Sequence, residues 1–269
     1  MIEIMHDRIA RGPFRVRFAV FDMDGTLSLI REGWPEVMAE AMLDELRRTP
    51  NHESESALRT FVAELIVRTT GQTTSYQMAC LADEVRQRGG QPEDPLIYKE
   101  RYLARLSPRI NKRLAALKAG QVEPADMMVP GAHEILEAMR ARQVRCYLIS
   151  GTYEPFVFDE ARALQIASYF SGIYGAQDDP RRFSKRQFMQ DLVDSYLLDG
   201  HEVVSLGDGI TEIREAKNVG AIAVGVASNE ATRTGIDENK RKLLIEAGAD
   251  VIVPDFIEHQ ALVAYLFNV

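Results

Sequence analysis

Short apolar runs rich in β-branched and aromatic residues recur along the chain and predict its strands. They occupy residues 17–21, 144–149, 203–206, 221–226 and 249–253. Runs this short and this continuously apolar are typical of strands buried on both faces, as in a parallel sheet that helices cover. We therefore predict a parallel sheet built from these runs.

Segments with apolar residues at helical spacing separate the later runs. In residues 131–142, Ile135, Leu136 and Met139 form one stripe, and charged residues lie opposite. Similar patterns predict helices at 154–165, 185–198, 212–218 and 237–246. Strands that alternate with helices through short connections indicate right-handed βαβ units. The predicted fold class is therefore α/β, a Rossmann-like open parallel sheet flanked by helices.

The region from about residue 28 to residue 128 breaks this alternation, because it holds no strand-like run. Apolar residues recur there at helical spacing in the segments 35–48, 54–69, 74–88, 95–106 and 108–118. Turn signals such as Gly71 separate these segments. We predict an all-helical domain at 29–127, inserted into an α/β core domain formed by 1–28 and 128–269.

Composition and charge exclude several classes of protein. The 269 residues, 46% hydrophobic and 27% charged, suffice for one large domain or for a domain with a smaller companion. The net charge of −8 repels a phosphate backbone, so we expect no nucleic-acid partner. No apolar run approaches the roughly 18 to 20 residues of a membrane span, so we expect no membrane partner. Cys80 and Cys146 lie far apart without a C-x-x-C or His cluster, which favours reduced thiols in a cytoplasmic protein.

Two aspartates follow the first apolar run, in the sequence FAVFDMDGTL. Ligands of open α/β sheets bind beyond the carboxyl ends of the strands, where Asp22 and Asp24 are expected to lie. Carboxylates this close raise each other's pKa unless a cation or a division of roles relieves them, and a divalent metal would do so. A calcium loop is excluded, because its twelfth position is Gly33 instead of Glu. A turn without function remains an alternative.

Two later runs also end in polar residues. Ser150 and Gly151 offer a hydroxyl and backbone N–H groups at the start of a helix, which suits an anion. Asp208 ends another run, and Glu212 follows four residues later; a dinucleotide motif is disfavoured there, because Glu212 stands where its third glycine belongs. A basic stretch lies between them, at Arg181, Arg182, Lys185 and Arg186.

In order and spacing, these features resemble the motifs of the haloacid dehalogenase superfamily of phosphatases. Asp22 and Asp24 match the first motif, Ser150 the second, Lys185 the third and Asp208 the fourth. The resemblance spans about residues 18–253 and points to the branch with a helical cap inserted after the first motif, similar to phosphoglycolate phosphatase and β-phosphoglucomutase. It therefore identifies the predicted helical insertion as a cap.

The resemblance implies roles for these residues. Asp22 would attack phosphorus and form an aspartyl-phosphate, and Asp24 would act as the general acid and then the general base. Mg²⁺ would be the cofactor, with Asp22, Asp24, Asp208 and Glu212 as its ligands. Catalysis would further need Ser150 and Lys185. The groups expected to bind the phosphorylated substrate belong to Met23, Gly25, Thr26, Ser150, Gly151 and Lys185.

Glu212 departs from the family pattern, which commonly has Asp at this position. It would support the metal directly or through water; the alternative is a first-turn Glu that the helix dipole favours. Glu212→Asp should leave activity within about tenfold. Arg182 and Arg186 are rivals of Lys185 for the role of the third motif.

The implied function is Mg²⁺-dependent hydrolysis of a small phosphorylated metabolite, such as a sugar phosphate or a phosphoglycolate-like acid, by a monomer or homodimer. A phosphomutase, a catalytically silent metal- or phosphate-binding protein and a nucleotide-binding redox protein are alternatives. Asp24 disfavours dehalogenation, and residues 28–40 lack the lysine that phosphonate cleavage would need. Candidates for setting specificity are Arg31, Trp34, Arg47 and Arg68. The basic segment 8–17 is an expected sheet edge or subunit contact.

Overall fold

The structure is a computed structural model that describes residues 1–6, 16–177 and 183–268. The chain divides into two compact units: Met1–Glu32 with Leu114–Val269, here the sheet unit, and Gly33–Arg113, here the helical unit. The helical unit is shorter than the predicted segment 29–127. Backbone contacts explain the difference, because Leu29 N donates to Met127 O at 2.8 Å and Ser28 forms a bridge with Met128, all within the sheet unit.

The sheet unit contains a seven-stranded sheet, among the described residues, in the order β1-β7-β6-β5-β2-β3-β4. All neighbours are parallel except β1, which is antiparallel to β7. The strands are β1 (Glu3–Ile4), β2 (Phe18–Phe21), β3 (Arg145–Tyr153), β4 (Phe170–Ala176), β5 (Val203–Gly207), β6 (Ile222–Val226) and β7 (Val251–Val253). The predicted α/β class with a mostly parallel sheet is confirmed.

Every predicted strand forms, and two strands form that the sequence pattern did not predict. β4 is interrupted by small and polar residues and is only partly buried, so it lacks a continuous apolar run. β1 has two residues, too few for any pattern. The predicted role of the segment 8–17 falls mostly on residues 8–15, outside the described residues. Arg17 is described, and it pairs with Glu202 at 2.9 Å.

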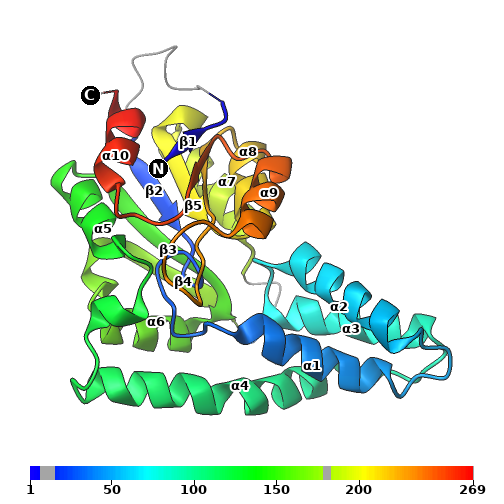
Figure 1. Cartoon of the computed structure of the whole chain (residues 1–269). Coiled ribbons are helices and arrows are strands. Elements are labelled where there is room, and N and C mark those ends of the chain that lie inside the picture. Colours follow the sequence, from blue (N-terminus) through cyan, green and yellow to red (C-terminus); the bar gives the residue numbers. More distant parts are fainter. Residues whose placement is uncertain (7–15, 178–182, 269) are drawn as a thin grey trace. The chain divides into compact units, whose positions relative to one another are not determined.

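Helices cover both faces of the sheet (Figure 1). One face carries α5 (Ala132–Ala141), α6 (Glu154–Ala163) and α10 (His259–Phe267), and the other carries α7 (Lys185–Tyr196), α8 (Ile210–Asn218) and α9 (Glu238–Ala247). Apolar residues of β2, β3, β5 and β6 are almost fully buried between these layers, as continuous apolar strands require. The described part of this unit also contains short 3₁₀ turns: η2 (Pro124–Met127), η3 (Ala167–Tyr169) and η5 (Gly200–Glu202).

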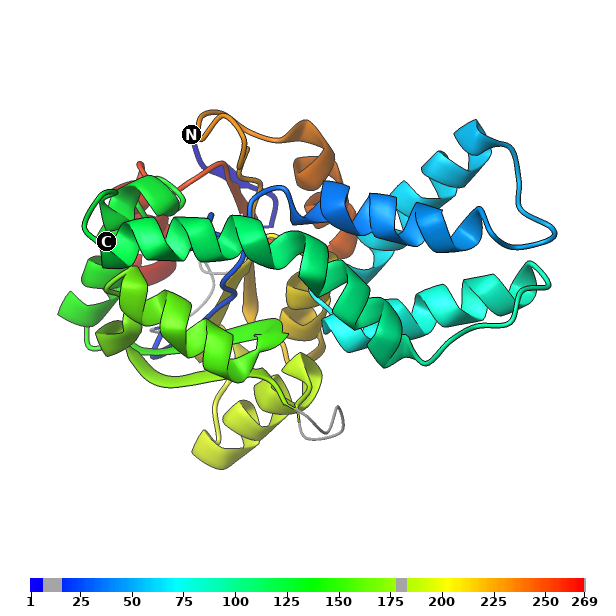
Figure 2. The same cartoon turned by 90° about the horizontal axis from the view of Figure 1, so that it is seen from below.

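The helical unit consists of α1 (Trp34–Leu46), α2 (Glu55–Thr69), α3 (Thr74–Gln87) and most of α4 (Pro95–Lys118). Ser54 and Thr73 cap α2 and α3 through their side-chain oxygens. The prediction of two helices at 95–106 and 108–118 is wrong, because α4 continues through Pro108 (Figure 2). Leu106 and Ile110 are buried on either side of that proline, so packing offsets the lost hydrogen bond.

No helix within the described part of the chain is both long enough and apolar enough to cross a membrane.

Candidate active site

The site lies where β2, β3 and β5 end side by side. Phe21 is in register with Leu148 of β3 and Leu206 of β5, so the residues that follow these strands share one edge of the sheet. Asp22 continues from β2, and its backbone N donates to Leu206 O at 2.9 Å. Asp208 follows β5 directly. The parallel register therefore brings together the first, second and fourth predicted motifs.

A buried lysine joins two of the predicted carboxylates. Lys185 is the first residue of α7, where the Ser184 side chain caps the helix. Its Nζ donates to Asp22 Oδ1 and to Glu212 Oε1. Burial alone would lower the pKa of Lys185, but the Asp22 and Glu212 carboxylates raise it above its ordinary value. Lys185 is therefore a fixed positive charge at Asp22. Its rival Arg186 is exposed, and Arg182 lies outside the described residues.

Asp22 is 6% exposed and lies in a strongly negative environment. Burial raises its pKa well above the usual range, and Lys185 opposes that rise. The neighbouring carboxylates of Glu212, Asp208 and Asp24 raise the pKa further, in that order. An added positive charge would stabilise the ionised form of Asp22. Acidic residues whose pKa is strongly shifted in this way are common in active sites.

Asp24 accepts hydrogen bonds from the end of β3. Thr152 Oγ1 donates to Asp24 Oδ2 at 3.1 Å, and Ser150 Oγ lies 3.5 Å from the same oxygen. Burial raises the pKa of Asp24, although Arg31 and the Thr152 hydroxyl lower it. A raised pKa favours the protonated form of Asp24, which is the form that a general acid needs.

Arg31 lies on the other side of Asp24. Its Nε is 3.5 Å from Asp24 Oδ1, and its Nη2 donates to Glu160 Oε1 at 2.5 Å. Glu160 belongs to α6 and is 1% exposed. Burial raises the pKa of Glu160 to about 7, while the Arg31 charge lowers it. Arg31, a candidate for specificity, thus borders the candidate general acid within the sheet unit.

Asp208 pairs with a second lysine. Lys240 Nζ donates to Asp208 Oδ2 at 2.7 Å and to Glu230 Oε1 at 2.6 Å. Burial alone would lower the pKa of Lys240, but the Asp208 and Glu230 charges raise it. Gly25, at φ +72°, leaves room for both carboxylates, because a Cβ there would lie 2.2 Å from Asp208 Oδ2 and 2.9 Å from Glu230 Oε1. The glycine is therefore required by close packing as well as by its backbone angle.

The remaining predicted residues lie in the same turn and strand. The side chains of Met23 and Thr26 are fully buried, so these residues can offer a substrate only their backbone groups. Gly151 lies within β3 between Ser150 and Thr152, and its backbone is at the edge where Asp24 accepts its hydrogen bonds. Sequence reasoning missed Thr152, although its spacing of two from Ser150 on a strand places both on one face.

The donor set suits Mg²⁺, a hard cation that prefers oxygen ligands. The Asp208 carboxylate raises the pKa of both Asp22 and Asp24. Glu212 Oε2 is buried without a hydrogen-bond partner among the described residues. Within residues 1–6, 16–177 and 183–268, however, no three acidic, His or Cys side chains form a ready-made metal cluster. The Asp22, Glu212 and Asp208 carboxylates contact lysines instead. Their role as metal ligands stays a prediction.

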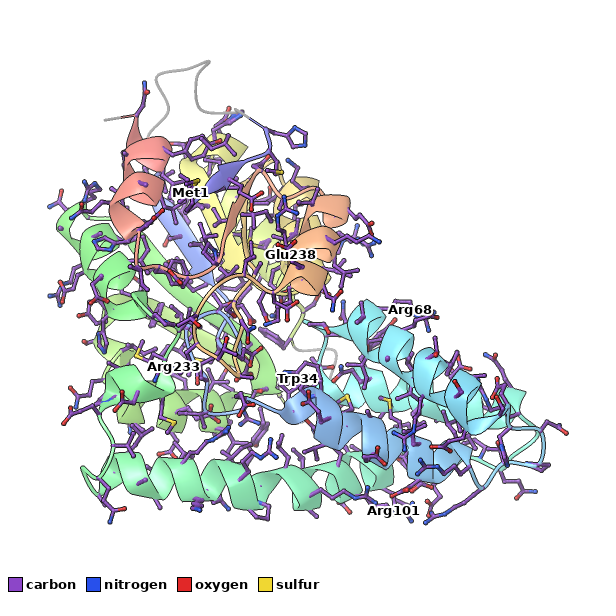
Figure 3. The ribbon with its side chains drawn as sticks, viewed as in Figure 1. Met1, Trp34, Arg68, Arg101, Arg233 and Glu238 are labelled. Carbon is purple, nitrogen blue, oxygen red and sulfur yellow. The ribbon has the colours of Figure 1, made fainter. Side chains whose placement is uncertain are left out.

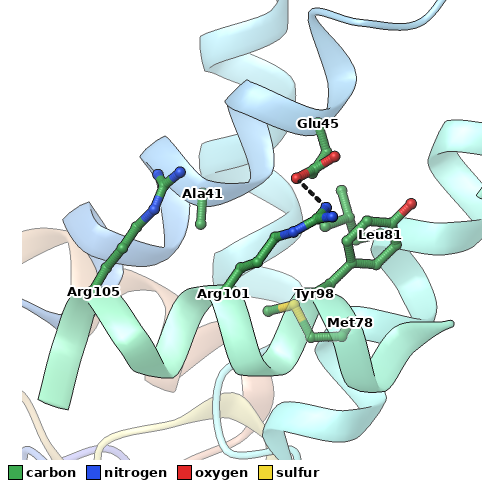
Figure 4. Close-up of a pocket in the computed structure, with 7 residues that line it drawn as sticks. All are labelled: Ala41, Glu45, Met78, Leu81, Tyr98, Arg101 and Arg105. Carbon is green, nitrogen blue, oxygen red and sulfur yellow. Dashed lines mark hydrogen bonds and ion pairs between the residues drawn. The ribbon is translucent and has the colours of Figure 1, made fainter. Parts of the chain in front are cut away.

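Three other candidates for specificity belong to the helical unit. Trp34 begins α1 and Arg68 lies near the end of α2 (Figure 3). Arg47 donates to Glu55 and to Asp44. A small pocket of this unit is lined by Ala41, Glu45, Met78, Leu81, Tyr98, Arg101 and Arg105 (Figure 4). It holds none of the predicted site residues, and Arg101 is paired there with Glu45 at 2.9 Å.

The sheet topology and the acidic residues at the strand ends define a Rossmann-like core with a candidate active site at one edge of the sheet. The chain belongs to the haloacid dehalogenase-like hydrolases, and the model of that family matches residues 16–220. The suspected superfamily is thereby confirmed.

Three individual proteins that resemble this chain are 25% identical to it or less. A 5′-nucleotidase of Pseudomonas aeruginosa is 25% identical over 208 residues, which are 77% of this chain and 80% of that protein. The structure of a predicted phosphoglycolate phosphatase from Haemophilus somnus matches with a TM-score of 0.59 at 17% identity, over 93% of this chain and 99% of that one. A β-phosphoglucomutase from Clostridium difficile matches with a TM-score of 0.59 at 12% identity, over 93% and 97%. These two structural likenesses establish the shared fold alone.

Proposed function

We propose that the protein is a Mg²⁺-dependent phosphatase that hydrolyses a small phosphorylated metabolite through an aspartyl-phosphate on Asp22. The observation that carries the proposal is the buried contact of Lys185 with Asp22, with Asp24 two residues away. Lys185 favours the ionised form of Asp22 against the opposing effect of burial and contacts one of its oxygens, and a nucleophilic carboxylate requires that form.

In the first step an Asp22 oxygen attacks phosphorus and the bond from phosphorus to the ester oxygen breaks. Asp24 gives its proton to the departing alkoxide, so that an alcohol leaves. In the second step water attacks the same phosphorus while Asp24 takes the proton, and phosphate leaves as the Asp22 carboxylate is restored. Thr152 and Ser150 hold the Asp24 carboxyl group for both transfers.

Lys185 and the hydroxyl of Ser150 would offset charge on the phosphoryl oxygens. Bound Mg²⁺ would add further charge neutralisation there, and Asp22, the Asp24 main-chain carbonyl and Asp208 are the groups proposed to hold it. Glu212 has two proposed roles, metal support and the positioning of Lys185, and its contact with Lys185 favours the second.

The substrate classes to test are sugar phosphates, phosphoglycolate-like acids and, because a relative is a 5′-nucleotidase, nucleoside monophosphates. We propose that the helical unit acts as the cap that selects among them. A phosphomutase remains the second candidate, since a substrate hydroxyl can replace water in the second step.

The test is phosphate release across these three classes with Mg²⁺, beside an EDTA control and the Asp22→Asn protein. We expect release by the native protein, loss with EDTA and a fall in kcat of roughly a thousandfold or more in Asp22→Asn. Release that survives Asp22→Asn would contradict the proposal. Isomerised sugar phosphate without free phosphate would identify the mutase instead.

A further inference from the structure

Lys240 contacts other carboxylates of the site than Lys185 does. It belongs to the first turn of α9, and its carboxylate partners in the described part of the chain are Asp208 and Glu230. The Asp208 and Glu230 side chains are 10% and 15% exposed. Two largely buried carboxylates thus share one ammonium group, and one of the two is a proposed Mg²⁺ ligand.

The fold holds this lysine in place. Asp237 caps α9 and accepts from the backbone N of Asn239 and of Lys240 at 2.9 and 3.0 Å. Ser228 Oγ donates to Gly25 O at 2.6 Å and ties the segment after β6 to the turn of the first motif. Lys240 is therefore a built part of the site and not a surface side chain that happens to reach Asp208.

We propose that Lys240 is an internal counter-cation that competes with Mg²⁺ for Asp208 and so sets the affinity of the site for the metal. A positive charge 2.7 Å from Asp208 Oδ2 opposes a second cation at that carboxylate. Glu230 gives the ammonium group another partner, so Lys240 can leave Asp208 for Glu230 when Mg²⁺ binds. The inference rests on the proposed function in one respect, that Mg²⁺ binds at Asp208.

Lys240 and its second partner, Glu230, then have opposite effects on the affinity for Mg²⁺. Lys240→Met removes the competitor, and we expect the Kd for Mg²⁺ to fall about tenfold. Glu230→Gln leaves Lys240 with Asp208 alone, and we expect the Kd to rise about threefold or more. Lys242→Met and Glu238→Gln are the matched controls, because they make the same two kinds of substitution at exposed positions of α9. Each should change the Kd less than twofold.

The experiment is calorimetric titration of Mg²⁺ into the metal-free full chain, with the Mg²⁺-induced change in Tm as a second readout. Lys240→Met should have a lower Tm than the native protein without metal and a larger gain in Tm with it, because its carboxylates then depend on Mg²⁺ alone. A Kd that is unchanged or raised in Lys240→Met would overturn the inference. If that variant does not fold, an unchanged or lowered Kd in Glu230→Gln overturns it equally.

Phosphate release separates this inference from the proposed function. If the native protein releases phosphate with Mg²⁺ while the Kd values do not follow the expected order, the counter-cation fails alone. If the native protein neither binds Mg²⁺ at millimolar concentration nor releases phosphate, both proposals fail.

Discussion

The buried charges of the proposed active site, in the sheet unit, contrast with the surface ion pairs of the helical unit. In the helical unit, pairs such as Arg59 with Glu40 lie at the surface, with both side chains about half exposed. In the sheet unit, the side chains of Asp22, Lys185 and Glu212 are 8%, 5% and 2% exposed. Water and salt weaken a surface pair, whereas a buried group pays a desolvation cost that only good partners offset. The charged groups with this desolvation cost lie at the proposed active site.

The comparison is tested most severely by Lys185→Met. This change leaves Asp22 and Glu212 buried without their shared cation, so we expect a loss of about 3 kcal/mol in the free energy of unfolding and a fall in kcat of roughly a hundredfold. Urea unfolding and phosphate release measure the two effects. Arg186→Met is the matched control at the next, exposed position, and it should change neither by much. Equal losses in the two variants would show that Lys185 has been misassigned.

A smaller effect is expected from Glu160 as the pH changes. Its pKa is raised to about 7 by burial, against an ordinary value of 4.5. Between pH 4.5 and pH 7, Glu160 keeps a proton in the folded protein that it releases in the unfolded chain. The contribution of Glu160 to the free energy of unfolding is therefore full below pH 4.5 and is lost as the pH rises through 7. We expect this group to account for a fall of roughly 2 kcal/mol between pH 5 and pH 8.

Glu160→Gln is the control for that pH dependence, because it keeps the shape of the side chain and removes the titration. Urea unfolding at several pH values should show a flatter profile for the variant than for the native protein. Parallel profiles would mean that Glu160 does not titrate in this range.

The smallest effect should come from the surface of the helical unit. We expect Arg59→Ala to change Tm by less than about 1 °C, because its pairs with Glu40 and Glu55 are exposed. Arg88→Ala provides the contrast within the same unit: Arg88 is 7% exposed, pairs with Glu53 and Glu84 and lies over the Phe61 ring. Thermal unfolding should show a clear decrease for Arg88→Ala. A large decrease for Arg59→Ala would break the distinction between exposed and buried charges.

Much of the sheet unit can be predicted from the sequence, because the apolar pattern of its strands matches their buried position in the sheet. Buried parallel strands are continuously apolar, so β2, β3, β5, β6 and β7 are visible in the sequence. β4 and β1 are not, since their pairing depends on neighbours distant in the chain. α10 was missed as well, and no side chain caps its N-terminus. Pro108 misled the prediction of α4, because tertiary packing outweighs its local preference.

The predictability of the site follows a similar division. Asp22, Asp24, Ser150, Lys185 and Asp208 follow a recognisable order of motifs, and the structure brings their segments to one edge of the sheet. The residues that contact this site from elsewhere in the chain belong to no recognisable motif. Arg31 meets Glu160 across 129 positions, and Lys240 meets Asp208 across 32, so only the folded chain reveals these pairs.

The two-residue strand β1 has a consequence for how the protein behaves in concentrated solution. It pairs with β7 through Glu3 and Ile4, and Arg241 holds Glu3 by two of its nitrogens, at 2.9 and 2.7 Å. Without β1, the edge of β7 would present unpaired backbone donors and acceptors beside an apolar sequence, which is a template for strand addition by another molecule. β1 therefore covers this edge, and we expect a change that removes its pairing with β7 to favour aggregation by strand addition.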